Sequence, residues 1–505
     1  MSALPDWLDP LYDAGEMRAV DAWAIERHAV PSLELMERAG EGLARCVARA
    51  AGPGPVRVVI GKGNNGGDGL VVARLLREEG REVDVLAAVP LHELRGDAAA
   101  NLRALPGQAP RPLHAGALGG SGVVVDALLG TGFTGEPHEP AAGAIAAINA
   151  CDATVVACDV PSGVDASTGE VAGEAVRAAV TATFHGPKVG LYVAPGALHA
   201  GAVEQVDIGV PRGAPAAASA GLIAERVLAL YPRRGRDASK FSSGVVVVAG
   251  GARGLTGAPA MAALAAQRAG AGYVQVAVPA SAELALALRL LEGMTRALPE
   301  QEGAHTPHGV EALLELAQRA GSVVLGPGLG RGEGAVAFAR ESARRLAVPL
   351  LIDADGLNAH AGQLESLRRR GAPTVLTPHA GELGRLLGRE PEAVGAHRLA
   401  CAREAAQTSG AVVLLKGDDT IVASPQGQVA ISAGGTPALA TAGTGDVLSG
   451  LIGALLAKGV DAFEAAALGC LAHVRAGVAA AEARTADGVI AGDVIEALPR
   501  ALHAQ

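Results

Sequence analysis

A glycine-rich segment that carries two amides and a carboxylate is the first place where this sequence could do chemistry. Residues 61–66, GKGNNG, satisfy the pattern G-x-G-x-x-G, and Asp84 lies about 20 residues further on. This is the written form of a dinucleotide-binding loop and would suggest a dehydrogenase. Asn64, Asn65 and Asp68, however, add donors and acceptors suited to a sugar, a base or a cation. We therefore reject the dehydrogenase interpretation. The simpler alternative to ligand binding by these polar residues is structural: Asn adopts left-handed backbone angles in a turn, and Asp68 caps the helix.

Two further polar loops follow predicted strands in the same part of the chain. DALLGTGFTG begins at Asp126, and DVPSGVD begins at Asp159. The carboxyl ends of parallel strands face one crevice, where ligands bind. We therefore expect Asn65, Asp126, Asp159 and Ser162 to lie at one site. Oxygen ligands with few formal charges suit a hard monovalent or divalent ion.

The second half of the chain carries a different motif, GTGDVLSG at 443–450. Glycines at a helix start leave backbone N–H groups free for phosphate oxygens. Asp446 would then lie beside the anion, where it could take a proton from an attacking hydroxyl. KGDDT, residues 416–420, follows a predicted strand and is suited to adenosine phosphates, although no GxxxxGK[ST] motif occurs. The simpler alternative for Asp446 is an ordinary first-turn carboxylate.

The elements that must position these motifs are short apolar strands alternating with helical segments. VRVVI (56–60) and GVVVVAGGA (244–252) are examples, and uninterrupted apolar strands are typical of parallel sheets covered on both faces. A proline-containing segment of small residues at 211–222 interrupts the alternation. We therefore predict two α/β domains, 1–215 and 222–505.

The segment before the first predicted strand has helical periodicity. Met36, Ala39, Leu43 and Val47 would share one face of it. A helix with one apolar face packs against a core. We interpret this opening region as packing helices, without a role in the chemistry.

Composition narrows the class of protein. The 505 residues are 50% hydrophobic and carry a net charge of −10, without the clustered basic residues that nucleic acid requires. Five scattered cysteines form no CxxC pair, and no HExxH metal motif occurs. The N-terminus lacks an apolar leader segment. We therefore expect a cytoplasmic protein with no nucleic-acid partner and no membrane segment.

The first set of motifs carries a family resemblance. GKGNNGGDGLVVARLL, DALLGTGFTG, DVPSGVDASTG and TFHGPKVGLY together resemble the N-terminal domain of the bifunctional NAD(P)H-hydrate repair family, from about Leu11 to Val210. The resemblance implies a Rossmann-like epimerase domain. A carboxylate could stabilise a cationic intermediate and handle its proton, so Asp159 is our candidate catalytic residue and Lys188 is a weaker second candidate. The resemblance also implies contacts to the hydrated nucleotide from Asn64, Asn65, Gly66, Gly67, Asp68, Gly130, Thr131, Gly132, Phe133, Thr134, Gly135, Glu136 and Asp159. It implies K⁺ coordination by Asn65, Asp126 and Ser162.

The second set is similar to the ribokinase-like, ADP/ATP-dependent NAD(P)H-hydrate dehydratases. The match rests on GTGD and KGDDT with GLTGAPAMAALAAQRAGAGYV, GPGLG, LLIDADGLN and TPHAGELGRLL, from about Leu228 to Pro499. It implies hydrate contacts from Ala258, Gly328, His379, Ala380, Gly381, Glu382, Leu383, Gly384, Arg385 and the catalytic Asp446. It implies nucleotide contacts from Lys416, Gly417, Asp418, Asp419, Thr420 and Gly445.

The resemblance implies two activities that act in turn on one damaged cofactor. The first domain would interconvert R- and S-NAD(P)HX, and the second would dehydrate the S form with ADP, giving AMP and phosphate, or with ATP. Mg²⁺ is expected on the phosphates, with ligands that the sequence does not name. We also expect a homo-oligomer.

Two other functions fit some of the motifs. GTGD alone permits a ribokinase-like small-alcohol kinase fused to a nucleotide-binding module. The first domain could also be a binding module without catalysis, although Asn65 and Asp159 are both present. Ala380 and Ala442 stand where the family usually has Pro and Gly, which leaves the preferred phosphate donor open.

Overall fold

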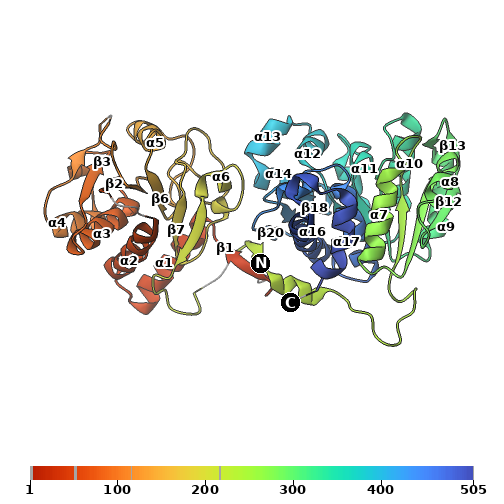
Figure 1. The fold of residues 1–505 in the computed structure, drawn as a ribbon, viewed down its shortest axis with the longest axis horizontal. Coiled ribbons are helices and arrows are strands. Elements are labelled where there is room, and N and C mark those ends of the chain that lie inside the picture. The colour runs from red at the N-terminus through yellow and green to blue at the C-terminus, as the bar shows by residue number, and fades with distance from the viewer. Residues whose placement is uncertain (1–3, 51–53, 115, 215–217, 504–505) are drawn as a thin grey trace. The chain divides into compact units, whose positions relative to one another are not determined.

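The chain divides into two compact units, described here separately. The computed structural model describes residues 4–50, 54–114, 116–214 and 218–503 (Figure 1). The first unit contains Pro10–Gly221, and the second contains Leu222 onward together with the N-terminal segment Pro5–Asp9. Within the segment where we predicted a boundary, residues 215–217 lie outside the described residues. A single cut near this segment does not account for Pro5–Asp9.

The first unit is built on a seven-stranded sheet in which the described strand pairs are parallel. Its order is β4-β3-β2-β5-β6-β7-β8. The strands are β2 (Val56–Ile60), β3 (Val83–Ala87), β4 (Arg111–Pro112), β5 (Val123–Ala127), β6 (Thr154–Cys158), β7 (Val180–Phe184) and β8 (Ala202–Val206). The chain order reverses between β2 and β5, which places a ligand-binding crevice at their carboxyl ends.

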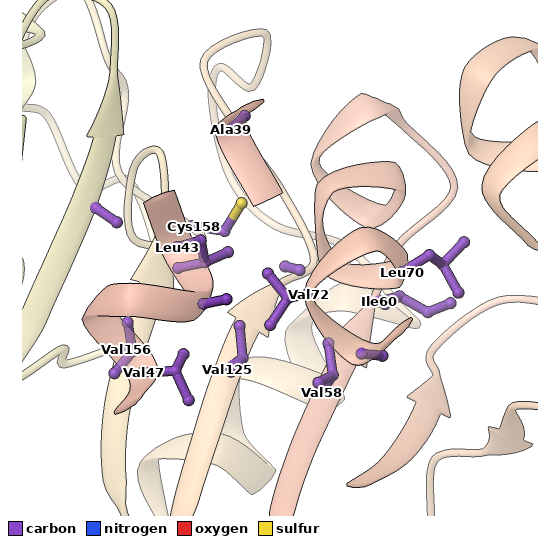
Figure 2. Close-up of a cluster of buried hydrophobic side chains, with 14 of the residues drawn as sticks. Ala39, Leu43, Val47, Val58, Ile60, Leu70, Val72, Val125, Val156 and Cys158 are labelled. Carbon is purple, nitrogen blue, oxygen red and sulfur yellow. The ribbon is translucent and has the colours of Figure 1, made fainter. Parts of the chain in front are cut away.

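Helices cover both faces of this sheet. They are α1 (Ala14–His28), α2 (Ser32–Ala50), α3 (Asn64–Glu78), α4 (Gly96–Ala104), α5 (Ala141–Asn149) and α6 (Ala197–Ala200). Figure 2 shows Leu43 and Val47 of α2 in one cluster with Val58, Val125 and Val156 of the strands. Neighbouring strand residues point to the opposite face and pack with α5. The predicted burial of one face of α2 is confirmed, since Met36, Ala39, Leu43 and Val47 are buried.

The second unit is built on an eleven-stranded mixed sheet. Its order is β1-β9-β20-β19-β18-β17-β16-β15-β10-β11-β12, parallel from β12 to β18 and antiparallel from β18 to β20. The strands are β1 (Leu8–Leu11), β9 (Ala220–Ile223), β10 (Val245–Ala249), β11 (Tyr273–Pro279), β12 (Met294–Leu298), β15 (Ser322–Leu325), β16 (Leu350–Ile352), β17 (Thr374–Leu376), β18 (Val412–Leu415), β19 (Ile421–Ala423) and β20 (Val429–Ile431). A separate hairpin pairs β13 (Glu300–Gln301) with β14 (Ala304–His305).

The helices of the second unit include one long apolar helix. They are α7 (Gly257–Arg268), α8 (Ala280–Ala287), α9 (Val310–Ala317), α10 (Glu333–Arg345), α11 (Asp355–Asn358), α12 (Ala380–Leu387), α13 (Pro391–Ala396), α14 (Arg398–Ser409), α15 (Thr444–Ala457), α16 (Ala462–Arg484) and α17 (Ala491–Ala501). Among the described helices, α16 alone is long and apolar enough to cross a membrane, and 67% of that stretch is buried in the protein. It packs against α15 and α17, as a core helix does. Both units confirm the predicted α/β class with parallel sheets.

Candidate active sites

The glycine loop of the first unit leaves a helix N-terminus open to a ligand. A Cβ on Gly61 would lie 2.0 Å from the carbonyl oxygen of Leu128, so only glycine fits that turn. Gly63 has open space beside it and caps α3 without a side-chain hydrogen bond. The first N–H groups of α3 are therefore available to an anion or a polar ligand. Asn64 is exposed, and Asn65 beside it is buried.

Asp84 does not take the position that a dehydrogenase requires. It is the second residue of β3, and therefore lies away from the carboxyl end of that strand. Its carboxylate pairs with Arg57 at 2.7 Å and with Arg111 at 3.0 Å. These ion pairs leave no acidic residue of β3 to receive a ribose hydroxyl, which supports rejecting the dehydrogenase interpretation.

Oxygen atoms from three loops gather around Asp126 at the end of β5. The carboxylate is fully buried and accepts hydrogen bonds from the Ser162 hydroxyl at 2.6 Å and the Ser162 N–H at 2.8 Å. The Leu129 carbonyl accepts from the Asn65 amide at 2.7 Å and from the Ser162 hydroxyl at 3.2 Å. Burial raises the pKa of Asp126 to about 6, although the Ser162 hydrogen bonds oppose this.

This donor set fits a monovalent cation. Among the described residues, Asp126 has no Lys or Arg partner, so its buried charge has no protein counter-ion. The side-chain oxygens of Asn65, Asp126 and Ser162 are hard ligands of the type that binds alkali and alkaline-earth cations. The structure thus brings together the three predicted K⁺ ligands. It adds the Leu129 carbonyl, a backbone group that no side-chain motif could indicate.

Asp159, the predicted catalytic carboxylate, lies at the end of β6 in a left-handed backbone conformation (φ 66°). A non-glycine residue in this region is strained and is typical of functional sites. Lys188, which is 1% exposed, donates to the Asp159 carboxylate at 2.5 Å, to Phe184 O at 2.9 Å and to Thr183 Oγ1 at 3.1 Å. The Thr131 hydroxyl also donates to Asp159.

These contacts determine the charge of Asp159. Burial alone would raise its pKa, but the charge and hydrogen bond of Lys188, with those of Thr131 and the Phe184 N–H, lower it below the ordinary value. Asp159 is therefore an anion at neutral pH. Lys188, a second candidate in the sequence, is a structural partner of that anion rather than a side chain open to the crevice.

Two further carboxylates share this environment. Asp68 of α3 is 8% exposed, and its pKa is raised well above the ordinary value by burial and by the charges of Asp159 and Asp21. Asp21 lies on α1, which we had interpreted as a packing helix. Its signal in the sequence is a carboxylate on the apolar side of that helix, next to Val20 and four residues from Met17.

The loop after β5 supplies a rim for this site. Gly130 and Thr131 are half-buried, and a Cβ on Gly130 would press on the Asn65 side chain at 3.1 Å. Further along the loop, Phe133 is half-buried, whereas the other predicted contacts are exposed: Gly132, Thr134, Gly135 and Glu136. Gly132 and Gly135 have open space on their Cβ sides. The rim is therefore free to approach a ligand.

The second unit forms its candidate site at the N-terminus of α15. Gly443 caps the helix in a left-handed conformation (φ 93°), and Asp446 lies in the first turn. Burial and the charges of Asp353 and Glu382 raise the pKa of Asp446 to about 7, although Lys416 opposes them. A carboxylate with this pKa is suited to general-base catalysis near neutral pH.

Lys416 joins the predicted motifs of this site. Its ammonium lies 2.9 Å from Asp353 and 3.8 Å from Glu382, and 3.6 Å from where a Gly445 Cβ would stand. Burial would lower its pKa, but these carboxylates raise it, so Lys416 is a cation. Asp353 is buried and also accepts a hydrogen bond from Ser449 at 2.7 Å. It lies within LLIDADGLN, yet the sequence did not assign it a role.

His379 begins α12 with a fixed tautomer. Its Nδ1 accepts hydrogen bonds from the N–H groups of Gly381 at 3.0 Å and Glu382 at 3.3 Å, while Glu382 bonds back to the His379 N–H at 3.0 Å. Burial, with the charges of Lys416 and Arg385 and against that of Glu382, lowers its pKa. The neutral ring therefore carries its proton on Nε2, which can be donated to a ligand.

The other residues predicted to contact the hydrate differ in their conformation, contacts and burial. Gly328 is in a left-handed conformation (φ 65°), and a Cβ there would lie 3.3 Å from that of Ala258. Arg385 donates to Asn358 at 2.7 Å. Leu383 and Gly384 are buried, so these two residues support the helix start through packing. Ala380 is half-buried.

In the 416–420 loop, the two aspartates have different surroundings. Asp419 is buried and pairs with buried Arg398 at 2.9 Å, whereas exposed Asp418 accepts from the Gly435 N–H at 2.8 Å. The Thr420 hydroxyl donates to Gly417 O at 2.7 Å. Among the described residues, no group of three or more His, Cys, Asp or Glu side chains could hold a metal ion.

Comparisons with known proteins cover both units. Residues 246–500 match the family model described as NAD(P)H-hydrate dehydratase, and residues 32–190 match that of the YjeF-related protein N-terminus. The bifunctional NAD(P)H-hydrate repair enzyme Nnr of Salinibacter ruber is 43% identical over 97% of this chain and 96% of its own length. That of Moorella thermoacetica is 40% identical over 98% and 96%.

One of the solved structures that resemble the chain corresponds to about half of it. The ADP/ATP-dependent NAD(P)H-hydrate dehydratase of Bacillus subtilis, co-crystallised with ATP and Mg²⁺, is 26% identical, with a TM-score of 0.47. The match covers 55% of this chain and 95% of that one.

Proposed function

This chain belongs to the family of bifunctional NAD(P)H-hydrate repair enzymes, and from that premise we propose how its two sites divide the work. The first unit interconverts R- and S-NAD(P)HX. The second dehydrates S-NAD(P)HX to NAD(P)H with ADP, giving AMP and phosphate, or with ATP. The observation that carries this proposal is that one chain holds two polar sites, each centred on a carboxylate whose charge state suits its step. A small-alcohol kinase would leave the first site unexplained.

In the first unit, the chemistry takes place at C6 of the hydrated ring, next to the ring nitrogen. Inversion of C6 requires the C–O bond to break and form again, and the ring becomes an iminium cation in between. Asp159 is an anion held by Lys188, and an anion stabilises that cation. The N-terminus of α3 and the rim from Gly130 to Glu136 would hold the nucleotide.

Potassium would be held by Asn65, Asp126 and Ser162, with the Leu129 carbonyl as a further ligand. When bound, the ion would neutralise the buried Asp126 carboxylate and supply positive charge to this site. The loops after β2, β5 and β6 then share one ligand. This arrangement would fix the spacing of Asn64 and Thr131 across the crevice.

In the second unit, Asp446 takes the proton from the C6 hydroxyl, and the oxygen attacks the terminal phosphorus of the donor. The bond from that phosphorus to the bridging oxygen breaks, which releases AMP from ADP or ADP from ATP. The phosphorylated oxygen then leaves as phosphate with the C–O electron pair, as the lone pair of the ring nitrogen forms the iminium. Loss of a C5 proton restores the dihydropyridine. Lys416 and Gly445 lie where they could hold the phosphates. Mg²⁺ would be carried mainly by the phosphates, because the described residues offer no cage for it.

We propose that the protein acts in the cytoplasm. The five cysteines are free, and four of them are buried. This is typical of proteins in a reducing compartment such as the cytoplasm. A homo-oligomer stays a prediction.

The test uses a mixture of R- and S-hydrates of NADH, incubated with ADP or ATP in parallel while NADH absorbance is followed. We expect complete conversion with the preferred donor. Asp159→Ala should stop conversion after the S form is consumed, and Asp446→Asn should slow NADH formation about 100-fold or more while R-to-S exchange continues. A stable phosphorylated alcohol, with no NADH, would instead indicate the kinase.

A further inference from the structure

One carboxylate of the first site lacks the counter-charge that Asp159 has. Asp68 is almost completely buried in α3, and no hydrogen bond or ion pair joins its carboxyl group to another described residue. Lys188 acts on it from a distance, but its three N–H donors go to Asp159, Thr183 and Phe184. Ionising an unpaired buried carboxyl group is costly, so the neutral form is favoured.

A third carboxylate approaches from α1, which is fixed to the Lys188 loop. Tyr12, just before α1, forms a parallel β-bridge with Lys188 through the backbone. The Tyr12 N–H donates to Pro187 O at 3.0 Å, and Tyr12 O accepts from the Val189 N–H at 3.1 Å. Asp13 and Glu16 then form a capping box that begins the helix. Asp21 lies on the side of α1 that buries Val20, and its charge acts on Asp68.

We infer that Asp68 is the proton donor of the first site and that Asp21 is the positioning residue that keeps Asp68 protonated. The inference rests on the epimerase function proposed above. Burial, then the charges of Asp159 and Asp21, raise the pKa of Asp68, whereas that of Asp159 is lowered. Two neighbouring carboxyl groups with opposite pKa shifts are the usual pairing of an acid with an anionic stabiliser.

The other described residues around Asp68 are uncharged. The Cys158 thiol of β6 interacts with it, and burial raises the pKa of that thiol well above its usual value, so it stays protonated. Met36 of α2 and Ala98 of α4 lie against the neighbouring residue Gly67. The charged groups that set the protonation of Asp68 are therefore Asp21, Asp159 and Lys188.

The proton has a defined use in the reaction. Asp68 gives it to the C6 oxygen as the C–O bond breaks, so the oxygen leaves as water with the electron pair. The lone pair of the ring nitrogen forms the C=N bond of the iminium, whose charge Asp159 stabilises. Water then adds to C6, the C=N electrons return to nitrogen, and the surplus proton returns to the Asp68 carboxylate.

The test compares the full-length wild-type chain with Asp68→Asn, Asp21→Asn and the control Glu26→Gln, an exposed residue of the same helix. R-to-S exchange is measured against pH, with S-hydrate dehydration as a check on folding. We expect Asp68→Asn to lower exchange about 100-fold or more. Asp21→Asn should move the alkaline limb of the rate profile down by about one pH unit while rates at acid pH persist. Loss of rate without movement of the limb would overturn the role of Asp21.

A measurement without substrate separates this inference from the proposed function. In a chain labelled with ¹³C at aspartate carboxyl groups, NMR should show one group that titrates well above the others, is absent in Asp68→Asn and titrates lower in Asp21→Asn. If no such group exists, the inference is wrong, whatever the exchange assay shows. If it behaves as expected but the wild type exchanges no hydrate, the proposed function fails and with it the proton-donor role, whereas the action of Asp21 on Asp68 is upheld.

Discussion

At the scale of single residues, environment rather than residue type separates the carboxylates of this protein. Asp159 begins the loop after β6, Asp446 follows the glycines at the start of α15, and both were assigned a catalytic role from the sequence. Asp159 has an ammonium partner and is an anion, whereas Asp446 shares Lys416 with Asp353 and Glu382 and titrates near neutrality. The same chemical group is thus prepared for electrostatic stabilisation in one unit and for proton transfer in the other.

The dehydratase step should therefore depend on pH in a defined direction. A pKa of about 7 leaves Asp446 protonated, and unable to act as a base, below that pH. We expect kcat/KM for S-hydrate dehydration to fall about tenfold per pH unit on the acid side and to level off above neutrality. Asp446→Asn should remove about 100-fold or more of the rate. The control is Asp487→Asn, which changes an exposed carboxylate. A rate that stays constant from about pH 5, roughly two pH units below the pKa of Asp446, up to neutrality would contradict its role as the base.

At the scale of elements, loops from the carboxyl ends of strands do the binding, and the cation proposal belongs to this scale. Loops after β2, β5 and β6 supply Asn65, Asp126 and Ser162, so one ion would tie three loops together. We expect K⁺ at 100 times its Kd to raise the free energy of unfolding of the first unit by about 2.7 kcal/mol, and its unfolding midpoint with it. The reference cation is tetramethylammonium, which is too large for the site. Exchange activity should rise in parallel.

The matched variant is Asp126→Asn, which keeps the shape but removes the charge. It should abolish the difference between the two cations in calorimetry and in exchange. The dehydratase activity of the same samples is the internal control. Equal midpoints of the wild type in both salts, across a wide range of concentrations, would refute the site.

The 416–420 loop gives a second prediction for an element. Asp419 and Arg398 form a buried pair, so removing one partner leaves an uncompensated buried charge. We expect Asp419→Asn to destabilise the second unit by about 3 kcal/mol in urea unfolding. Asp418→Asn, on the exposed side of the loop, should change stability by less than about 0.5 kcal/mol. If Asp419→Asn weakens only nucleotide binding and leaves stability unchanged, the residue contacts the nucleotide directly, as its motif had suggested.

At the scale of the whole molecule, a short N-terminal segment belongs to the second unit rather than to the first. Pro5–Asp9 is grouped with the second unit, and buried Trp7 packs against Phe463 of α16 with ring centroids 5.7 Å apart. Trp7→Ala should therefore cost about 3 kcal/mol in the second unit. The variant should lose dehydratase activity at a lower temperature than the wild type does, while the temperature at which half of the R-to-S exchange activity is lost should stay the same. The reverse order of loss would contradict this assignment.

From the residues alone we predicted the α/β class, the parallel strands, the strand-end motifs and the family. These depend on local patterns: apolar runs of strand length and glycine motifs next to polar side chains remain legible within a few residues. We also expected Asn65, Asp126, Asp159 and Ser162 at one site, because the carboxyl ends of parallel strands lie at the same edge of a sheet.

The charge states of those groups, and the residues from other segments that join them, became clear from the folded chain. Asp21 of α1, the Leu129 carbonyl and Asp353 enter the sites through contacts between segments far apart in the chain. Asp84 matched a motif but lies away from the ligand edge of its strand, paired with Arg57. A pKa depends on burial and on neighbouring charges, and both are set by packing between elements rather than by the order of residues.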